Sequence, residues 1–208
     1  MELQTDLWTN EVILEGQRLR LEPIGLEHIE SLARHTVFDK QFVAEFGGCR
    51  NRADVEKEVR SCLARRAEQK ENGFVMVDKE SGEAVGYSNF LYMERTRRNL
   101  DIGRTRIGPK WHKSFVNTEA KLLMLEYAFE TLKCIRVGFK VDSLNFNSQR
   151  AVKRIGGKFE GEVRNYLLLP DGRKRDFHSY SILDTEWPNV KTTLLGYLEK
   201  HNVSSHSL

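Results

Sequence analysis

The chain of 208 residues contains few cysteines, and their spacing predicts no cross-link that would stabilise the fold. Cys49, Cys62 and Cys134 are odd in number, lie far apart and form no Cys-x-x-Cys pair. No pair of histidines lies near them at the spacing of a zinc site. We therefore expect neither a disulfide framework nor a structural zinc, and we assign no residue to a metal.

The sequence also lacks a long apolar run and a strong excess of one charge. No stretch approaches the roughly 20 apolar residues that span a bilayer, and the N-terminus lacks the basic start and apolar core of a signal peptide. The 33 Lys and Arg residues are interspersed with 30 Asp and Glu residues, a balance too even to favour wholesale nucleic-acid binding. We expect a cytoplasmic protein with neither a membrane nor a nucleic-acid partner.

What the sequence does contain is a succession of periodic segments that predicts one α+β domain. Apolar spacing favours helices over residues 26–35, 54–70, 118–132, 145–155 and 187–201. Alternation favours strands over residues 19–23, 74–78, 84–93, 99–107, 135–141, 158–169 and 175–183. This order predicts a mixed, mostly antiparallel, twisted sheet of about seven strands flanked by helices. We place residues 1–201 in the domain and residues 202–208 in a flexible C-terminal tail.

Short polar residues and glycines mark the predicted ends of these segments. Asp54 is a candidate N-cap for the second helix, and Asn117 or Thr118 for the third. Gly156 and Gly157 can end the fourth helix, and Pro170-Asp171-Gly172 predicts a turn between the last two strands.

The segment from Leu100 to Gly156 carries the clearest functional signal. It places a strand, a loop at residues 111–117 and a long amphipathic helix in that order. The free N–H groups and positive dipole end of a helix N-terminus bind pyrophosphate when the preceding loop lets the ligand approach. The pattern favours a phosphorylated ligand, although an ordinary strand-to-helix connection explains the loop by itself equally well.

Several short motifs resemble one known family over nearly the whole chain. They are Leu19-Arg20-Leu21, Gly86-Tyr87, Asp101-Ile102-Gly103, Ile107-Gly108, Trp111, Asn117-Thr118-Glu119-Ala120-Lys121, Asn145 with Ser148, and Arg154-Ile155-Gly156. Together they resemble the GNAT superfamily of N-acetyltransferases, and within it the branch of the ribosomal-protein-alanine N-acetyltransferases. The resemblance implies acetyl-CoA as co-substrate and direct transfer of its acetyl group to a primary amine.

In that family the loop before the long helix supplies backbone N–H groups to the pyrophosphate of acetyl-CoA. The resemblance implies a set of cofactor-binding residues: Ile107, His112, Lys113, Ser114, Phe115, Val116, Asn117, Thr118, Asn145, Ser148 and Arg150. Phe115 and Asn117 occupy positions at which the family usually has glycine or alanine, whose small size permits close approach of phosphate. The alternative is therefore a catalytically degenerate CoA-binding sensor or partner-binding module. Asn145 has a structural alternative too, because it can cap its helix.

Acetyl transfer needs a deprotonated amine and a polarised thioester carbonyl, held together. Asp101 lies where relatives carry an acidic residue and is the candidate base, with a surface position at a strand start as the alternative. Gly103 can mark a bulge in the same strand. Many relatives use a tyrosine acid where this chain has Val152, so Ser148 becomes the nearest candidate acid.

The acceptor is a primary amine, on a small molecule or at a protein N-terminus, that the sequence does not identify. Candidate substrate residues are Glu45 on a loop and the strand residues Asn89, Tyr166 and His178. Relatives often form homodimers, and the sequence does not choose between a monomer and a homodimer. A basic hairpin end with Arg95, Arg97 and Arg98 leaves nucleic-acid accessory binding as a third hypothesis.

Overall fold

The computed structural model describes residues 11–38, 40–169 and 172–205, which build one sheet with helices on both faces. Within this part of the chain the sheet has eight strands in the order β1-β2-β3-β4-β5-β6-β8-β7. They are β1 (Leu14–Glu15), β2 (Leu19–Pro23), β3 (Glu71–Asp78), β4 (Ala84–Glu94), β5 (Asn99–Ile107), β6 (Arg136–Asp142), β7 (Lys158–Leu168) and β8 (Lys174–Leu183). Neighbouring strands are antiparallel except β5 and β6, which are parallel. The predicted α+β class is confirmed, and the short β1 is a strand that the sequence did not predict.

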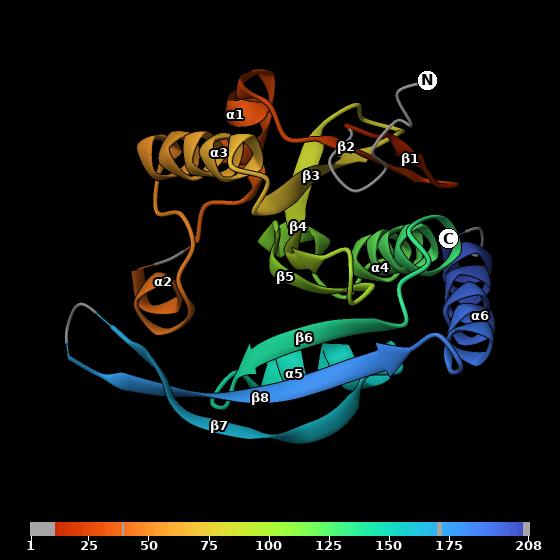
Figure 1. Cartoon of the computed structure of the whole chain (residues 1–208). Coiled ribbons are helices and arrows are strands. Elements are labelled where there is room, and N and C mark those ends of the chain that lie inside the picture. Colours follow the sequence, from red (N-terminus) through yellow and green to blue (C-terminus); the bar gives the residue numbers. More distant parts are fainter. Residues whose placement is uncertain (1–10, 39, 170–171, 206–208) are drawn as a thin grey trace, which may run out of the picture.

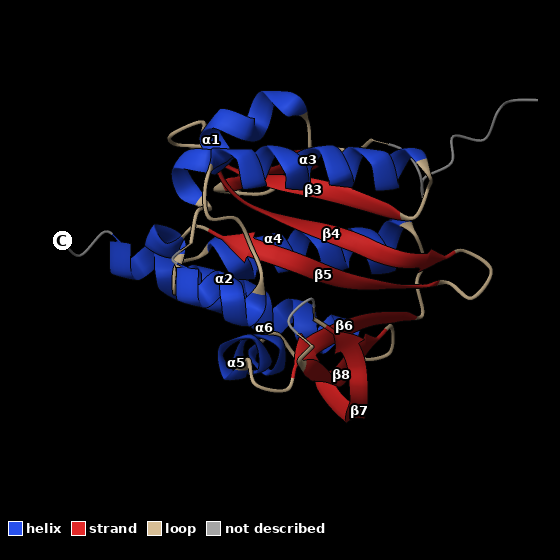
Figure 2. Cartoon of the chain, turned by 90° about the vertical axis from the view of Figure 1, so that its left-hand side faces the viewer, coloured by secondary structure: helices blue, strands red, loops and turns tan. Residues whose placement is uncertain are grey.

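The helices divide between the two faces of the sheet (Figure 2). They are α1 (Ile29–His35, after a 3₁₀ turn at Leu26–His28), α2 (Lys40–Phe46), α3 (Arg52–Ala67), α4 (Val116–Glu126), α5 (Phe146–Arg154) and α6 (Trp187–Ser205). A further 3₁₀ turn, Pro109–Trp111, precedes α4, and a π-helical turn, Tyr127–Thr131, follows it. Apolar residues of α1 and α3 share a core cluster with β3 and β4 on one face. Those of α4, α5 and α6 share the larger cluster on the other face. No helix in the described residues is long and apolar enough to cross a membrane.

Several predicted boundaries differ from the structure. Asn51, and not Asp54, caps α3, because the Asn51 side chain accepts a hydrogen bond from the Asp54 N–H at 3.0 Å. The Asp54 carboxylate instead accepts from the Arg50 N–H at 2.9 Å. Helix α2 was not predicted, and α6 continues to Ser205, past its predicted end near residue 201. The predicted turn residues Pro170 and Asp171, and residues 206–208 of the predicted tail, lie outside the described residues.

Helix α5 ends as predicted. Gly156 follows it with φ +98°, a left-handed conformation that glycine adopts without strain. A Cβ at this position would also meet the Val190 side chain of α6 at 2.6 Å. Glycine therefore both ends α5 and lets α6 approach it closely.

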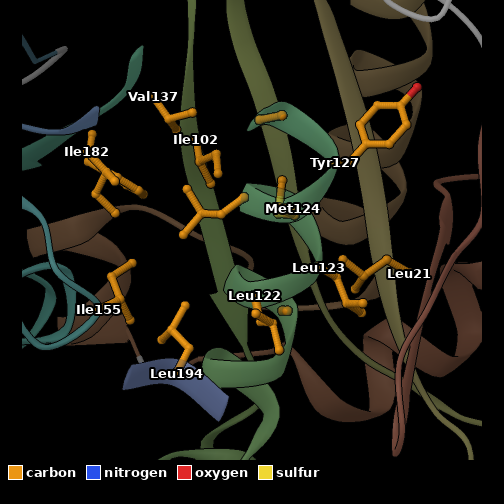
Figure 3. Close-up of a cluster of buried hydrophobic side chains, with 14 of the residues drawn as sticks. Leu21, Ile102, Leu122, Leu123, Met124, Tyr127, Val137, Ile155, Ile182 and Leu194 are labelled. Carbon is orange, nitrogen blue, oxygen red and sulfur yellow. The ribbon is translucent and has the colours of Figure 1, made fainter. Parts of the chain in front are cut away.

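Helix α4 is buried on nearly all of its sides and forms the centre of the larger core. The sequence predicted a single apolar stripe, but the buried residues run without interruption from Thr118 to Leu125. Figure 3 shows Leu123 beside Leu21 of β2, while Leu122 lies on the side of Leu194 of α6. Because α4 is enclosed, its polar side chains are buried too, and each needs a partner inside the protein.

Glu119 of α4 meets this need by binding the backbone of β2. Its Oε1 accepts hydrogen bonds from the N–H groups of Arg18 at 2.8 Å and Leu19 at 3.2 Å. The Glu119 side chain and Leu19 are buried and Arg18 is half-buried, so without the carboxylate both N–H groups lose their acceptor in a mostly enclosed place. Glu119 therefore ties the central helix to the start of β2.

We expect Glu119→Ala to lower the free energy of unfolding by about 2 kcal/mol or more, because it leaves two mostly enclosed N–H groups without an acceptor. Glu119→Gln keeps one acceptor oxygen and is expected to cost clearly less. Urea unfolding of both variants, with the exposed Glu199→Ala of α6 as control, measures the effect. A Glu119→Ala protein as stable as the control would contradict this account.

Lys121 is the second enclosed polar residue of α4. Its Nζ donates to Thr105 Oγ1 of β5 at 2.7 Å and to Ser88 Oγ of β4 at 3.0 Å. Burial lowers the pKa of this ammonium from 10.5 to about 7, because the charged form loses its hydration. The native protein therefore binds this proton more weakly than the unfolded chain does.

This difference predicts a stability that rises with pH. Between about pH 7 and pH 10 the unfolded chain keeps a proton on Lys121 that the native protein has released, so each pH unit adds up to about 1.4 kcal/mol. The variant Lys121→Met lacks the titrating amine. The difference between the unfolding free energies of wild type and variant therefore isolates the contribution of Lys121, because the other titrating groups contribute equally to both. We expect the difference to increase between about pH 7 and pH 9 in urea unfolding, in favour of the wild type. A difference that stays constant would show that Lys121 keeps an ordinary pKa.

Candidate active site

The sheet opens between its two parallel strands. The ladder of β5 and β6 joins residues Asn99–Asp101 to Arg136–Gly138. Among the described residues no further ladder pair joins the two strands, although β5 continues to Ile107 and β6 to Asp142. The chain leaves these carboxyl ends toward α4 and α5 respectively. In open α/β sheets such a divergence at the carboxyl ends of parallel strands is where ligands bind.

A β-bulge lies in β5 along this opening. Asn89 pairs with Gly103 and Tyr87 with Arg106, so Ser88 of β4 faces both Arg104 and Thr105. Arg104 has φ +50°, which accounts for the local turn of the strand. The predicted bulge is thus present, centred on the residues after Gly103. A bulge interrupts the ladder and can turn a backbone N–H toward a ligand.

The loop before α4 accommodates Phe115 without the conformation that glycine provides. Phe115 has helical angles, φ −65° and ψ −23°, and the left-handed residue of the loop is Lys113 at φ +58°. The Phe115 ring is buried, lies 3.6 Å from the Arg18 guanidinium and makes an edge contact with Trp111. Its side chain is therefore packed inside the protein, against Arg18 and Trp111.

The N-cap of α4 is Phe115, which makes no side-chain cap hydrogen bond, so the predicted caps Asn117 and Thr118 are wrong. Ser114 Oγ accepts a hydrogen bond from the Val116 N–H at 3.3 Å and donates one to the Trp111 carbonyl at 2.7 Å. The next N–H groups of this turn, at Asn117 and Thr118, have no acceptor within the helix. They present positive charge at the carboxyl end of β5, as an anion site requires.

A guanidinium that the sequence analysis did not select lies beside this turn. Arg154, at the end of α5, donates to Thr118 Oγ1, and its guanidinium lies 4.8 Å from the centre of the Tyr197 ring of α6. Arg150, which was selected, donates instead to Asn147 on its own helix. His112 is engaged within the loop, with its Nε2 at 2.9 Å from the Ile107 carbonyl oxygen. The sequence analysis quoted Arg154 only as part of the Arg154-Ile155-Gly156 motif, and its position four residues after Arg150 places it on the same face of the helix.

Asn145 and Ser148 lie at the start of α5, at the carboxyl end of β6. Asn145 is the N-cap, and its Oδ1 accepts from the Ser148 N–H at 3.0 Å. The capping alternative is therefore what the structure shows for this oxygen. The predicted contacts of both residues with a cofactor stay predictions.

Asp101 belongs to a charged and aromatic cluster on the sheet face opposite α4. Its neighbours Leu100 and Ile102 point into the core beneath α4, so alternation places Asp101 on the other face. Asp101 Oδ2 lies 3.2 Å from Lys140 Nζ, which in turn lies 4.3 Å from the centre of the Tyr92 ring and 5.6 Å from that of Tyr166.

Glycine on the neighbouring strand makes room for this carboxylate. A Cβ at Gly138 would collide with Asp101 Oδ1, so the position tolerates no side chain. Partial burial lowers the pKa of Lys140, but the nearby Asp101 carboxylate outweighs it and the pKa is raised overall. A hydrogen bond with Tyr166 raises the pKa of Tyr92. The arrangement is a carboxylate with two phenol rings around an ammonium group.

The four candidate substrate residues do not come together. Tyr166 lies beside the Asp101 cluster. Asn89 is fully buried on the side of α3, where its Oδ1 accepts a weak hydrogen bond from Cys62. His178 lies on the face of β8 that carries Tyr180, 3.1 Å from Glu162, and Glu45 is exposed on α2. Only Tyr166 is therefore placed beside the candidate base, and the roles of the other three stay predictions.

Comparison with known proteins identifies the family. Residues 18–158 match the model of the acetyltransferase (GNAT) domain. The chain is 25% identical over 174 residues to the uncharacterized N-acetyltransferase YoaA of Bacillus subtilis (strain 168), an alignment that covers 82% of this chain and 96% of YoaA.

Solved structures agree with this match. A GCN5-related N-acetyltransferase from Brucella melitensis superposes with a TM-score of 0.82 at 28% identity, covering 91% of this chain and 86% of that one. The ribosomal-protein-S5-alanine acetyltransferase from Vibrio fischeri shares the fold, with a TM-score of 0.68 at 16% identity over 85% of this chain and 99% of that one. The resemblance found in the sequence is confirmed. The chain belongs to the acetyltransferase (GNAT) family and is an N-acetyltransferase of the GNAT type.

Proposed function

We propose that the protein transfers the acetyl group of acetyl-CoA directly to a primary amine, without an acetylated enzyme on the path. One observation carries the proposal. The uncapped N-terminus of α4 opens at the carboxyl ends of the diverging strands β5 and β6, and the Phe115 ring is packed inside the protein. The N-terminus of α4, which suits an anion, therefore lies next to the unpaired edge of β5. A ligand with a pyrophosphate and an extended arm needs both features side by side.

The residues present fit acetyl-CoA. The N–H groups of Asn117 and Thr118 would hold the pyrophosphate, with Arg154 and Lys113 as nearby cations. The free edge of β5 beyond Asp101 would bind the amide groups of the pantetheine arm as a strand does. The bulge at Arg104 and Thr105 would present N–H groups to the thioester carbonyl.

Acetyl-CoA supplies an activated acyl group, and the protein supplies position and a base. The Asp101 carboxylate takes a proton from the acceptor ammonium, directly or through water, which frees the nitrogen lone pair. The new N–C bond would form as the C–S bond breaks, the nitrogen would lose its second proton to solvent to become the amide, and the departing thiolate would take up a proton. Ser148 is the candidate donor of that proton.

The acceptor is a cationic primary amine, on a small molecule or at a protein N-terminus. Asp101 supplies negative charge, and the faces of Tyr92 and Tyr166 attract an ammonium group. The alternative of a degenerate binding module rests on Phe115 and Asn117 at glycine positions and on Val152 where many relatives have a tyrosine. The burial of the Phe115 ring supports the enzyme, because the ring packs inside the protein.

Asn117→Asp is expected to weaken acetyl-CoA binding at least tenfold, because it places a carboxylate where the phosphates would bind. The same change stabilises a helix N-terminus through the dipole, so the thermal midpoint is expected to stay unchanged or to rise. Calorimetric titration with acetyl-CoA and a thermal melt measure the two effects.

Asn189→Asp is the matched control, since Asn189 is exposed in the first turn of α6, far from the proposed site in the chain. Titration with CoA lacking its 3′-phosphate adds a test of the nucleotide end. Wild-type protein that fails to bind acetyl-CoA at millimolar concentration would overturn the proposed function, and equal affinity in Asn117→Asp would remove α4 as the phosphate site.

Asp101→Asn is expected to lower turnover by about 10²-fold or more while acetyl-CoA affinity stays unchanged, because the amide cannot accept the proton. The measurement is release of CoA thiol over a panel of primary amines and N-terminal peptides. Asp184→Asn, at an exposed aspartate before α6, controls for loss of charge. Full activity in Asp101→Asn would assign the base elsewhere.

A further inference from the structure

Lys121 makes polar contacts that the folding of α4 alone does not explain. Its side chain is enclosed, and no described carboxylate forms an ion pair with it. A buried ammonium without a counter-ion is costly, and an apolar side chain of similar length would fill the same space without that cost. The stability of the fold thus gives no reason to keep a lysine here.

The two partners of Lys121 face each other at the bulge, Thr105 within it on β5 and Ser88 opposite it on β4. Thr105 is one of the two residues that face Ser88 across the strand pair, and the two hydroxyl oxygens are 2.7 Å apart. Ser88 Oγ also lies 3.4 Å from the Gly103 carbonyl oxygen. Lys121, Ser88 and Thr105 therefore form a closed hydrogen-bonded triangle directly beneath the bulge.

The triangle connects the bulge with the helix that begins at the anion site. Lys121 follows Thr118 by three residues, so it lies about one turn beyond the N–H groups that end α4. A helix is stiff over such a distance, and the ammonium group fixes its distance from β5 through two hydrogen bonds. The two parts of the cofactor site are therefore joined by one side chain.

We infer that Lys121 is a positioning residue, which holds the β5 bulge at a fixed distance from the N-terminus of α4. At that distance the N–H groups of α4 can bind the pyrophosphate while the N–H groups of the bulge bind the thioester carbonyl. The inference rests on the proposed function. Backbone donors stabilise charge on a carbonyl oxygen only when they are placed correctly beforehand, and a displacement of about 1 Å is enough to cost about 10²-fold in rate. Its lowered pKa agrees with this role, because a neutral amine still donates to one hydroxyl and accepts from another.

The test uses acetyl-CoA labelled with ¹³C at the acetyl carbonyl, which requires no knowledge of the acceptor. Polarisation by backbone N–H groups moves the carbonyl resonance of bound acetyl-CoA away from its position in solution. In Lys121→Met we expect this shift to be mostly lost, while affinity for CoA stays within about threefold of wild type. Lys57→Met, at an exposed position of α3, is the matched control and is expected to keep the full shift.

A second pair of variants keeps Lys121 in place. Thr105→Val preserves the shape of the side chain and removes the hydroxyl, and it is expected to lose the shift as Lys121→Met does. Thr105→Ser restores the hydroxyl and is expected to recover it. If Lys121→Met does not fold, judged by circular dichroism, this pair decides the question.

The outcomes separate the inference from the function on which it rests. Wild-type protein that does not bind acetyl-CoA would overturn the proposed function. Wild-type protein that binds it without a carbonyl shift, or variants Lys121→Met and Thr105→Val that keep the shift, would overturn the role of Lys121 alone. Weakened CoA binding in Lys121→Met with the carbonyl shift intact would likewise show a general structural role.

Discussion

The enclosure of α4 is the constraint on which the rest of the structure depends. A helix buried on nearly every side must find partners for each polar group it carries, and two of the partners found here belong to the proposed acetyl-CoA site. Glu119 binds the backbone at the start of β2, Thr118 accepts from Arg154, and Lys121 reaches the bulge of β5. The same burial that stabilises the core therefore fixes the loop, the strand edge and the neighbouring guanidinium relative to one another.

The loop before α4 shows how one conformational requirement can be met at a different residue. Relatives place glycine where this chain has Phe115, and glycine serves there for tight turning and close phosphate approach. In this chain Lys113 adopts the left-handed angle, and Phe115 adopts ordinary helical angles with its ring in the core. The ring also packs against Arg18, whose own N–H binds Glu119. A substitution that the family pattern marks as a loss thus becomes part of the packing that holds the helix.

Sequence reasoning predicted what local periodicity determines and missed what distant partners determine. Strands β2 and β5 were predicted with their observed bounds, because alternation over a half-buried surface is a local signal. Helix α2, only seven residues long, has no such signal. The cap of α3 is Asn51 and not the predicted Asp54. The prediction failed because Asn and Asp have similar N-cap preferences, so the sequence does not choose between two candidates three residues apart. Lys121 was quoted only as part of a motif, since no spacing in the sequence shows that its partners lie 16 and 33 residues away.

The Asp101 cluster shows a further consequence of the parallel pairing of β5 and β6. Gly138 stands beside Asp101 because the strands still pair there, and Lys140, two residues on along β6, reaches back to the carboxylate. The ammonium of Lys140 therefore lies against a carboxylate and two phenol rings. An acceptor amine is expected to bind in the same position. Under the mechanism proposed above, with Asp101 as the base, an acceptor would either displace Lys140 from Asp101 or approach the carboxylate from another side. The first route selects acceptors whose own charge and shape replace those of a lysine side chain, and so the choice of substrate begins with a residue of the protein itself.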